Sequence, residues 1–429
     1  MSQPTVIIGA GVIGLSTAYY LSQDPSCSDP SNIHLVESSP ELFASASGNA
    51  AGFLSKDWFH PDLCPLGRLS FDLHREFAST HRGREKYGFN RSISSSYVPA
   101  DYDDGSGKRK ERPEDWLREG VSRAEAAAGK DFGKGEAPAW LKAAKGQQVD
   151  ILSKEDTTAN LDPLKFCQFL LDEVKEKGVQ LHQPAEVYSV VYDTANELSG
   201  VHLSTNNGSI EVPCRRLIIA SGAWTPQVFS QLFPSSRVSP SVNALSGHSM
   251  ILRMPSWKAP SAGQDCHAVF TTDPTGYFPE MFSRVDGTVW LGGLNSATLP
   301  LPPARNGKAV PILEDKEKLR MTAQALYGFQ PDSQDVEVLR EALCFRPVTP
   351  RAVPIIGEVP DQLLGDGLKT GRGGGVFAVS GHGPWGITLC LGTGLVASEL
   401  IEGKKTSADI ARLGLQLTER QAEMVRAKL

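Results

Sequence analysis

Several features that mark large protein classes are missing from this sequence of 429 residues. Its seven cysteines include no C-x-x-C pair, which argues against a zinc site or a disulfide framework, so we expect reduced thiols and no metal. The net charge is −6 and Lys and Arg form no long run, which argues against nucleic acid or a membrane surface as the main partner. The partner we expect is a small molecule.

Long apolar runs are also missing. No apolar stretch approaches the ~20 residues that span a bilayer, and the first predicted strand begins near residue 5, which leaves no room for a signal segment. We therefore predict an intracellular protein, cytoplasmic or peroxisomal, without a membrane span. The final Ala427-Lys428-Leu429 differs from the peroxisomal address Ser-Lys-Leu only in its first residue and predicts an import receptor as a partner. A chance ending on an exposed helix tail is the alternative.

The first forty residues carry the pattern of a dinucleotide site. A β-branched apolar run, 5–8, leads directly into Gly9-Ala10-Gly11-Val12-Ile13-Gly14 and a helix to about residue 21. Gly9 permits the tight turn, Gly11 lets the backbone approach a pyrophosphate, and Gly14 lets the helix lie close to the strand. A second strand, 33–36, ends in Glu37, where an acidic residue binds ribose hydroxyls and disfavours the 2′-phosphate of NADP. A nicotinamide and a flavin both remain open at this point.

Three further segments place small residues where a flat ligand can lie against the backbone. "ASASGNAAGFLS", 44–55, has neither helical nor strand periodicity, "SGAW" follows a predicted strand at 217–219, and "GHGPWG" lies between a strand at 376–379 and a small-residue helix at 387–401. A linker and an ordinary buried strand end are the alternatives for the first two. A nicotinamide enzyme would normally proceed straight into its next βα unit, so these segments favour a flavin.

Between these segments the sequence predicts one clear helix and a series of strands. "LDPLKFCQFLLDEVKEKG" is capped by Asp162, begins with Pro163 and ends at Gly178. Strands follow at 179–181, 187–192, 201–204 and 217–219, and "GYFPEMFSRVDGTVWLGG" alternates as strands around a turn at Asp286-Gly287. The pattern is α/β, with a strand-rich second part.

In this order and spacing, "VIIGAGVIGLSTAYYL…HLVE", "ASGNAAGFLS", "RLIIASGAW", "CFRPVTPRAVPIIGE" and "GHGPWGITLCLGTGLVASELIEG" resemble the D-amino-acid oxidase and glycine/sarcosine oxidase superfamily of FAD enzymes. The resemblance implies a Rossmann-like FAD-binding domain of the glutathione-reductase type and an α+β substrate domain on a mostly antiparallel sheet. We expect the FAD-binding domain in residues 1–58, 148–230 and 345–429. The substrate domain would comprise 59–147 and 231–344, with a charged insertion at about 95–147 that departs from the family.

The same resemblance assigns the site residues. Arg346, in "CFRPVTP", would hold the substrate carboxylate, and an ion pair with an internal Asp or Glu is the alternative. Tyr277 is positioned like an active-site tyrosine of the substrate sheet, and a packing role is the alternative. Cys344 lies near where some relatives join a cysteine to the flavin, although relatives that keep the arginine generally hold FAD without a covalent bond. The residues expected to bind FAD are Gly9, Gly11, Val12, Ile13, Gly14, Glu37, Ser38, Ser45, Ser47, Gly48, Asn49, Ala51, Gly52, Phe53, Val187, Ser221, Gly222, Trp224, Arg346, Gly381, His382, Gly383, Trp385, Gly386, Ile387 and Thr388.

The function that the resemblance implies is oxidation of an amino acid or a related carboxylate-bearing amine. A hydride would pass to flavin N5, the imine would leave, and dioxygen would reoxidise the flavin to give hydrogen peroxide. Three alternatives stay open: a dehydrogenase of the same fold with another electron acceptor, a non-catalytic FAD protein that serves assembly or trafficking, and an NAD-dependent dehydrogenase. The yield of hydrogen peroxide under air distinguishes an oxidase from the dehydrogenase. A colourless purified protein would indicate the NAD-dependent dehydrogenase.

Overall fold

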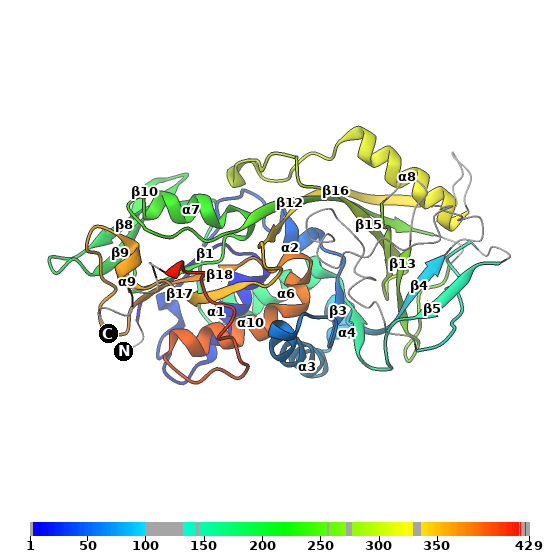
Figure 1. Cartoon of the computed structure of the whole chain (residues 1–429), viewed down its shortest axis with the longest axis horizontal. Helices are drawn as coiled ribbons and strands as arrows, with labels where there is room; N and C mark the ends of the chain where they lie inside the picture. The colour runs from blue at the N-terminus through cyan, green and yellow to red at the C-terminus, as the bar shows by residue number, and fades with distance from the viewer. Residues whose placement is uncertain are drawn as a thin grey trace.

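The computed structural model describes residues 3–98, 132–142, 146–254, 257–271, 277–328, 336–419, 421 and 425. Most of the predicted charged insertion, and the C-terminal tripeptide, therefore lie outside the described residues. The described residues form two large β-sheets, one on each side of Figure 1, and a small three-stranded sheet, and helices pack on the two large sheets.

The first sheet has six strands in the order β17-β18-β11-β1-β2-β7, and all neighbours are parallel except β17 and β18. Three separated stretches of the chain supply its strands: β1 (Thr5–Ile8), β2 (Ile33–Val36), β7 (Gln180–His182), β11 (Arg216–Ile219), β17 (Ile355–Glu358) and β18 (Gly375–Ser380). The predicted limits of β1 and β2 are confirmed. The order reverses at β1, because β2 lies on one side of it and β11 on the other.

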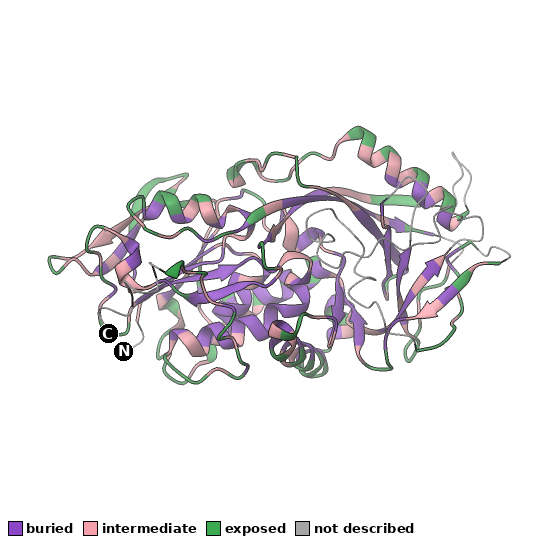
Figure 2. Ribbon diagram, viewed as in Figure 1, coloured by how far each residue is buried: buried purple, intermediate pink, exposed green. Residues whose placement is uncertain are grey.

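Helices α1 (Val12–Gln23), α3 (Cys64–Thr80), α6 (Pro163–Glu176) and α10 (Gly386–Ile401) form a common core with this sheet. Asp162 caps α6 as predicted, because its carboxylate accepts the N–H groups of Leu164 and Lys165. Among the described residues one helix, Gly383–Ile401, is long and apolar enough to cross a membrane, and 72% of its apolar window is buried inside the protein. Its contacts with α1 and α3 account for its composition (Figure 2).

A three-stranded antiparallel meander shares a second core with the same sheet and with α7 (Thr225–Leu232). Its strands are β8 (Ala185–Tyr192), β9 (Leu198–Thr205) and β10 (Gly208–Pro213). The sequence predicted β8 and β9 but not β10, whose side chains are almost all exposed and therefore give no apolar alternation.

The second sheet has nine strands in the order β16-β12-β15-β14-β13-β4-β6-β3, with β5 paired to β4. It is mostly antiparallel, and it is built from β3 (Phe53–Ser55), β4 (Asn90–Val98), β5 (Gln148–Ile151), β6 (Thr158–Asn160), β12 (Asn243–Arg253), β13 (Cys266–Thr271), β14 (Glu280–Ser283), β15 (Thr288–Ser296) and β16 (Glu337–Val348). Helix α8 (Leu313–Tyr327) packs on it. The predicted fold class is confirmed. The domain limits stay a prediction, and β3 and β6 pair within this second sheet.

Short helix α2 (Ala46–Asn49) joins the two sheets. Its carbonyl groups accept hydrogen bonds from the second sheet: the Arg340 guanidinium donates to Gly48 at 3.0 Å, and the Trp290 indole donates to Asn49 at 3.3 Å. The Phe345 backbone N–H donates to Ser45 Oγ at 3.2 Å. The small-residue segment that the sequence left without a periodicity is thus fixed between the sheets. The remaining short helices are α4 (Gly83–Tyr87) and α9 (Asp361–Leu364).

Candidate functional site

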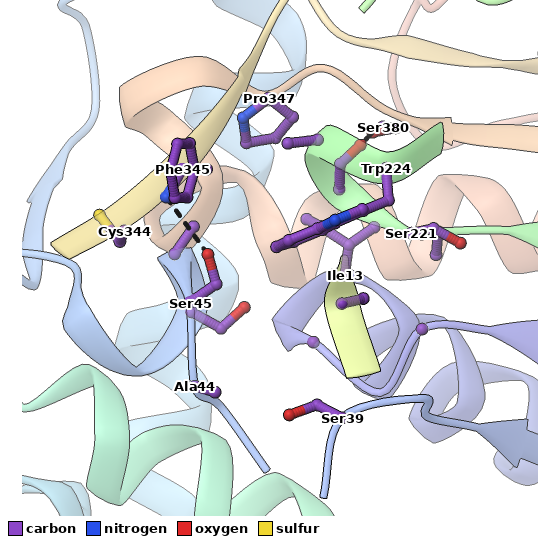
Figure 3. Close-up of a pocket in the computed structure, with 18 of the residues that line it drawn as sticks. Ile13, Ser39, Ala44, Ser45, Ser221, Trp224, Cys344, Phe345, Pro347 and Ser380 are labelled. Atoms are coloured by element: carbon purple, nitrogen blue, oxygen red, sulfur yellow. Dashed lines mark hydrogen bonds between the residues drawn. The ribbon is translucent and has the colours of Figure 1, made fainter. Parts of the chain in front are cut away.

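A cavity of about 550 Å³ opens at the carboxyl ends of the parallel strands, where the first sheet meets β16. Residues at the ends of β1, β2, β11 and β18 line it on one side. Figure 3 shows Cys344 and Phe345 on one side of the cavity and Ile13, Ser39 and Ser221 on the other, with Trp224 between them. Ligands of open α/β sheets bind at this edge, next to the point where the strand order reverses.

The first turn of α1 forms the floor of the cavity. Gly9 has φ +107°, and a Cβ there would lie 2.5 Å from the carbonyl oxygen of Ala220, so only glycine fits this turn. A Cβ on Gly14 would lie 2.0 Å from the carbonyl oxygen of Gly9, which explains the close approach of helix and strand. Val12 N–H donates to Ser47 Oγ, whereas the N–H groups of Ile13 and Gly14 have no acceptor within the helix. This helix end therefore offers donors and positive potential to an anionic group.

Glu37 presents a fixed carboxylate to the same cavity. Its two oxygens accept the backbone N–H groups of Ala10, at 3.1 Å, and Ser39, at 2.9 Å. Burial raises the pKa of this carboxyl, while these N–H groups act in the opposite direction. Glu37 lines the cavity together with Val187, so its remaining lone pairs suit ribose hydroxyls.

The turn before α10 contributes His382, which is buried and neutral. Burial lowers its pKa to about 3. Its Nε2 pairs with Thr393 Oγ1 at 3.0 Å, and its Nδ1 has no hydrogen-bond partner among the described residues. An isolated bridge between Val348 and His382 joins this turn to the end of β16. The turn is thus held against the strand that carries Arg346.

Arg346 is half-buried and lines the cavity from β16. Its Nη1 donates to Asn295 Oδ1 of β15 at 2.6 Å. Its guanidinium crosses β12 at Gly247, where a Cβ would lie 2.8 Å from Nη2. Asn295 and Gly247 therefore position a cation at the cavity wall with N–H groups left for a ligand.

Cys344 also lines the cavity and is 4% exposed. Burial raises the pKa of its thiol, and the nearby Arg346 and Arg340 guanidinium groups act in the opposite direction. Since the thiolate is the nucleophilic form, this environment disfavours attack by Cys344 at neutral pH.

The structure brings most of the predicted site residues to one cavity. Those that line it are Gly9, Gly11, Val12, Ile13, Glu37, Ser38, Ser45, Ser47, Asn49, Ala51, Val187, Ser221, Gly222, Trp224, Arg346, His382, Gly383, Gly386 and Ile387. Others lie behind the lining, namely Gly14, Gly48, Gly52, Phe53, Gly381, Trp385 and Thr388. Thr388, for example, is buried and donates its hydroxyl to the carbonyl of Phe53, so its contacts are structural.

The structure does not bring Tyr277 to the cavity. Its hydroxyl donates to Thr322 Oγ1 of α8 at 2.6 Å, and its ring belongs to the buried cluster beneath that helix. A tyrosine that finds a hydrogen-bond partner inside such a core is satisfied there. In this structure Tyr277 therefore has the packing role that was its alternative, and its part in catalysis stays a prediction.

Two groups of lining residues were not predicted. Trp290 and Ser380 come from strands or strand ends that the sequence did predict, whereas Phe345 and Pro347 come from β16, which was not predicted as a strand. The sequence gives no sign of the direction in which these four side chains point. The segment 301–307, in "LPPARNGK", also lines the cavity. Its prolines indicate a loop between β15 and α8, and they give no sign that this loop lines the cavity. Among the described residues no group of three or more His, Cys, Asp or Glu side chains is placed to hold a metal ion.

Comparison with known proteins gives several matches that cover from about half of the chain to nearly all of it. The sequence model of the DAO family, described as FAD dependent oxidoreductase, matches residues 5–400. A Schizosaccharomyces pombe protein named only as an oxidoreductase is 27% identical over 95% of this chain and 97% of its own length. The D-amino acid dehydrogenase of Vibrio cholerae is 24% identical over 59% of this chain and 50% of its own.

A similar fold is found in the crystal structure of glycine oxidase from Geobacillus kaustophilus. The TM-score is 0.66 with 21% identity, and the superposition covers 97% of this chain and 98% of that one. At this level of identity the likeness concerns the fold.

Proposed function

Since the chain belongs to the DAO family of FAD-dependent oxidoreductases, we propose that it oxidises a carboxylate-bearing amine, an amino acid or a close relative, at a carbon–nitrogen bond. The observation that carries the substrate class is Arg346, a half-buried guanidinium that faces the cofactor cavity from the second sheet. The same cavity supports FAD as the cofactor that the family implies.

The described residues fit FAD at three places. The first turn of α1, with Gly11, Val12 and Ile13 in the lining, presents its N-terminus to a pyrophosphate, and the fixed carboxylate of Glu37 suits a ribose. The small-residue segment with Ser45 and the turn with His382 would face the ring system. His382 Nδ1 is buried without a hydrogen-bond partner among the described residues, so it could bind a polar atom of the ligand.

A guanidinium suits a carboxylate because two parallel charge-assisted hydrogen bonds fix both its position and its tilt. Asn295 occupies one N–H of Arg346 and holds the group over Gly247, so its remaining donors are preorganised. The apolar side chains of Phe345, Pro347 and Trp224 would reduce the access of water to a substrate bound there.

FAD, when bound, supplies the hydride acceptor that turns the amine into an imine, and its reoxidation by dioxygen yields hydrogen peroxide. The chain's own part is to orient the substrate and to keep the site dry. Burial lowers the pKa of His382 to about 3, which favours its neutral form with one donor and one acceptor nitrogen. Within the described lining, the acidic residues Glu37, Glu41 and Glu186 come from the segments after β2 and in β8, on the dinucleotide side.

The purified protein tests the proposal directly. We expect flavin absorbance, bleached anaerobically by at least one member of a panel of glycine, sarcosine and D- and L-amino acids, and not by the matching amines without a carboxylate. Hydrogen peroxide formed under air identifies an oxidase, and turnover only with an artificial electron acceptor identifies a dehydrogenase. If the flavin is bleached equally by the decarboxylated amines, the assigned role of Arg346 is wrong.

A further inference from the structure

Residues 301–308, which we call the strap, run along the cofactor cavity between Trp224 and Glu41. The strap lies between the end of β15 at Ser296 and the start of α8 at Leu313. All of its residues except Lys308 and Asn306 line the cavity. It therefore forms a wall that belongs neither to the first sheet nor to β16.

Both ends of the strap are tied to the segments that follow strands of the first sheet. At one end the indole N–H of Trp224, which follows β11, donates to the carbonyl of Pro302 at 2.7 Å. At the other end the Lys308 ammonium pairs with the Glu41 carboxylate, which follows β2, at 2.5 Å. The strap thus bridges the crevice from the β11 side to the β2 side.

The chain beyond the strap is also anchored. Ala309 forms a bridge with Leu343 of β16, and the Ile312 N–H donates to His248 Nε2 on β12 at 3.1 Å. His248 Nδ1 lies 3.2 Å from the Asp315 carboxylate in the first turn of α8. These contacts fix the position from which the strap departs.

Arg305 lies between the two ties, in a single 3-10 turn at Ala304–Asn306. It is exposed and lines the cavity, and it has no ionic partner among the described residues. The first turn of α1, where a pyrophosphate fits, lines the same cavity. Among the described residues, an exposed guanidinium without an ionic partner therefore shares the cavity with the helix end that would bind two negative charges.

We propose that the strap holds the ADP half of FAD in the crevice and that Arg305 pairs with its phosphates. Arg305 supplies a charge-assisted hydrogen bond from outside, opposite the helix N-terminus. Because the strap is tied at both sides, FAD leaves only after Trp224 and Lys308 release it. The inference rests on FAD as the cofactor and not on the amine, so a protein inactive toward every amine would still test it.

The first experiment replaces Arg305 by glutamine and measures binding of ADP and FAD to the apoprotein. Loss of one charge-assisted hydrogen bond predicts about 10-fold weaker binding of both ligands, with a smaller dependence on salt than in the wild type. The matched control is Arg372→Gln, because Arg372 is an exposed arginine in the turn before β18, at the opposite edge of the sheet. Unchanged ADP affinity in Arg305→Gln, or an equal loss in both variants, would overturn the role of Arg305.

The second experiment measures FAD release from the holoprotein after dilution, by the gain of flavin fluorescence. Trp224→Phe keeps an aromatic ring but removes the N–H that holds Pro302, and Lys308→Gln removes the ion pair with Glu41. We expect FAD to be released faster from each variant than from the wild type, and fastest from the double variant. Release at the wild-type rate in Lys308→Gln and in the double variant would show that the strap does not retain FAD.

Discussion

Replacement of Arg346 by glutamine is expected to weaken carboxylate binding by about 10²- to 10⁴-fold. A bidentate contact comprises two charge-assisted hydrogen bonds of about 1.5–3 kcal/mol each, which sum to about 3–6 kcal/mol, and about 1.4 kcal/mol corresponds to one factor of ten. Arg346 is half-buried, so solvent screening favours the lower part of this range. Arg346→Lys keeps the charge but loses the planar guanidinium, and we expect it to weaken carboxylate binding by about 10- to 10²-fold.

The assay uses acetate and its neutral isostere acetamide, so it needs no knowledge of the natural amine. Each is titrated against the flavin absorbance of the holoprotein. The wild type should prefer acetate, and Arg346→Gln should abolish that preference. Arg351→Gln is the matched control, because Arg351 lies five residues along the chain, is exposed, and has its carboxylate partner at Asp62 rather than at the cavity.

Arg346 does not bind the carboxylate if Arg346→Gln retains the preference for acetate while its flavin spectrum and FAD content match those of the wild type. An equal loss of affinity for both ligands would contradict this role as well, since a lost carboxylate contact affects only the anion. A variant that purifies without FAD would indicate that Arg346 supports the cofactor, and the titration with Arg346→Lys then decides the substrate role.

Three further predictions concern other parts of the site and the core. Gly247→Ala places a Cβ 2.8 Å from Arg346 Nη2 and should weaken acetate binding by about 10-fold without loss of FAD; unchanged acetate affinity would contradict it. Acid precipitation should leave FAD in the supernatant for both the wild type and Cys344→Ser, because burial raises the pKa of the Cys344 thiol; a yellow wild-type pellet would disprove this. Burial also lowers the pKa of His74 to about 4. Below about pH 6.5 the unfolded chain therefore binds a proton that the folded chain does not, and the free energy of unfolding decreases as the pH is lowered. At pH 5 the cost is about 2 kcal/mol relative to pH 7, and urea unfolding of His74→Gln should lack this part of the pH dependence.

Much of the first sheet could be predicted because its signals are local. The strand at Thr5–Ile8, the glycines of the first turn and the cap at Asp162 act on neighbours in the chain, and each was found at its predicted place. The same holds for the strand and small-residue helix around His382. Backbone geometry of this kind leaves a direct imprint on residue type.

What could not be predicted depends on contacts between distant residues. The sequence around Phe53 gives no sign that this strand pairs with β6 in the second sheet. The sequence around Tyr277 does not distinguish a tyrosine packed in the core from a catalytic one. The role of His248 follows from Ile312 and Asp315, more than sixty residues away along the chain. Such contacts are chosen by the packing of whole elements, and the residue types alone do not record them.

In the cavity, the first sheet, which would bind the cofactor, is held to β16, which carries the proposed substrate-binding Arg346, by direct contacts between the two. Ser45 Oγ binds the backbone N–H of Phe345, and His382 is bridged to Val348, so β16 is fixed to the first sheet on both sides of Arg346. A shift of either sheet would therefore move the guanidinium relative to the flavin position, and a displacement of about 1 Å is enough to impair an oriented reaction. It follows that Ser45→Ala, which removes one of these bonds but no charge, should lower turnover more than it lowers affinity for acetate. Equal losses in both quantities would mean that Ser45 acts on FAD binding alone.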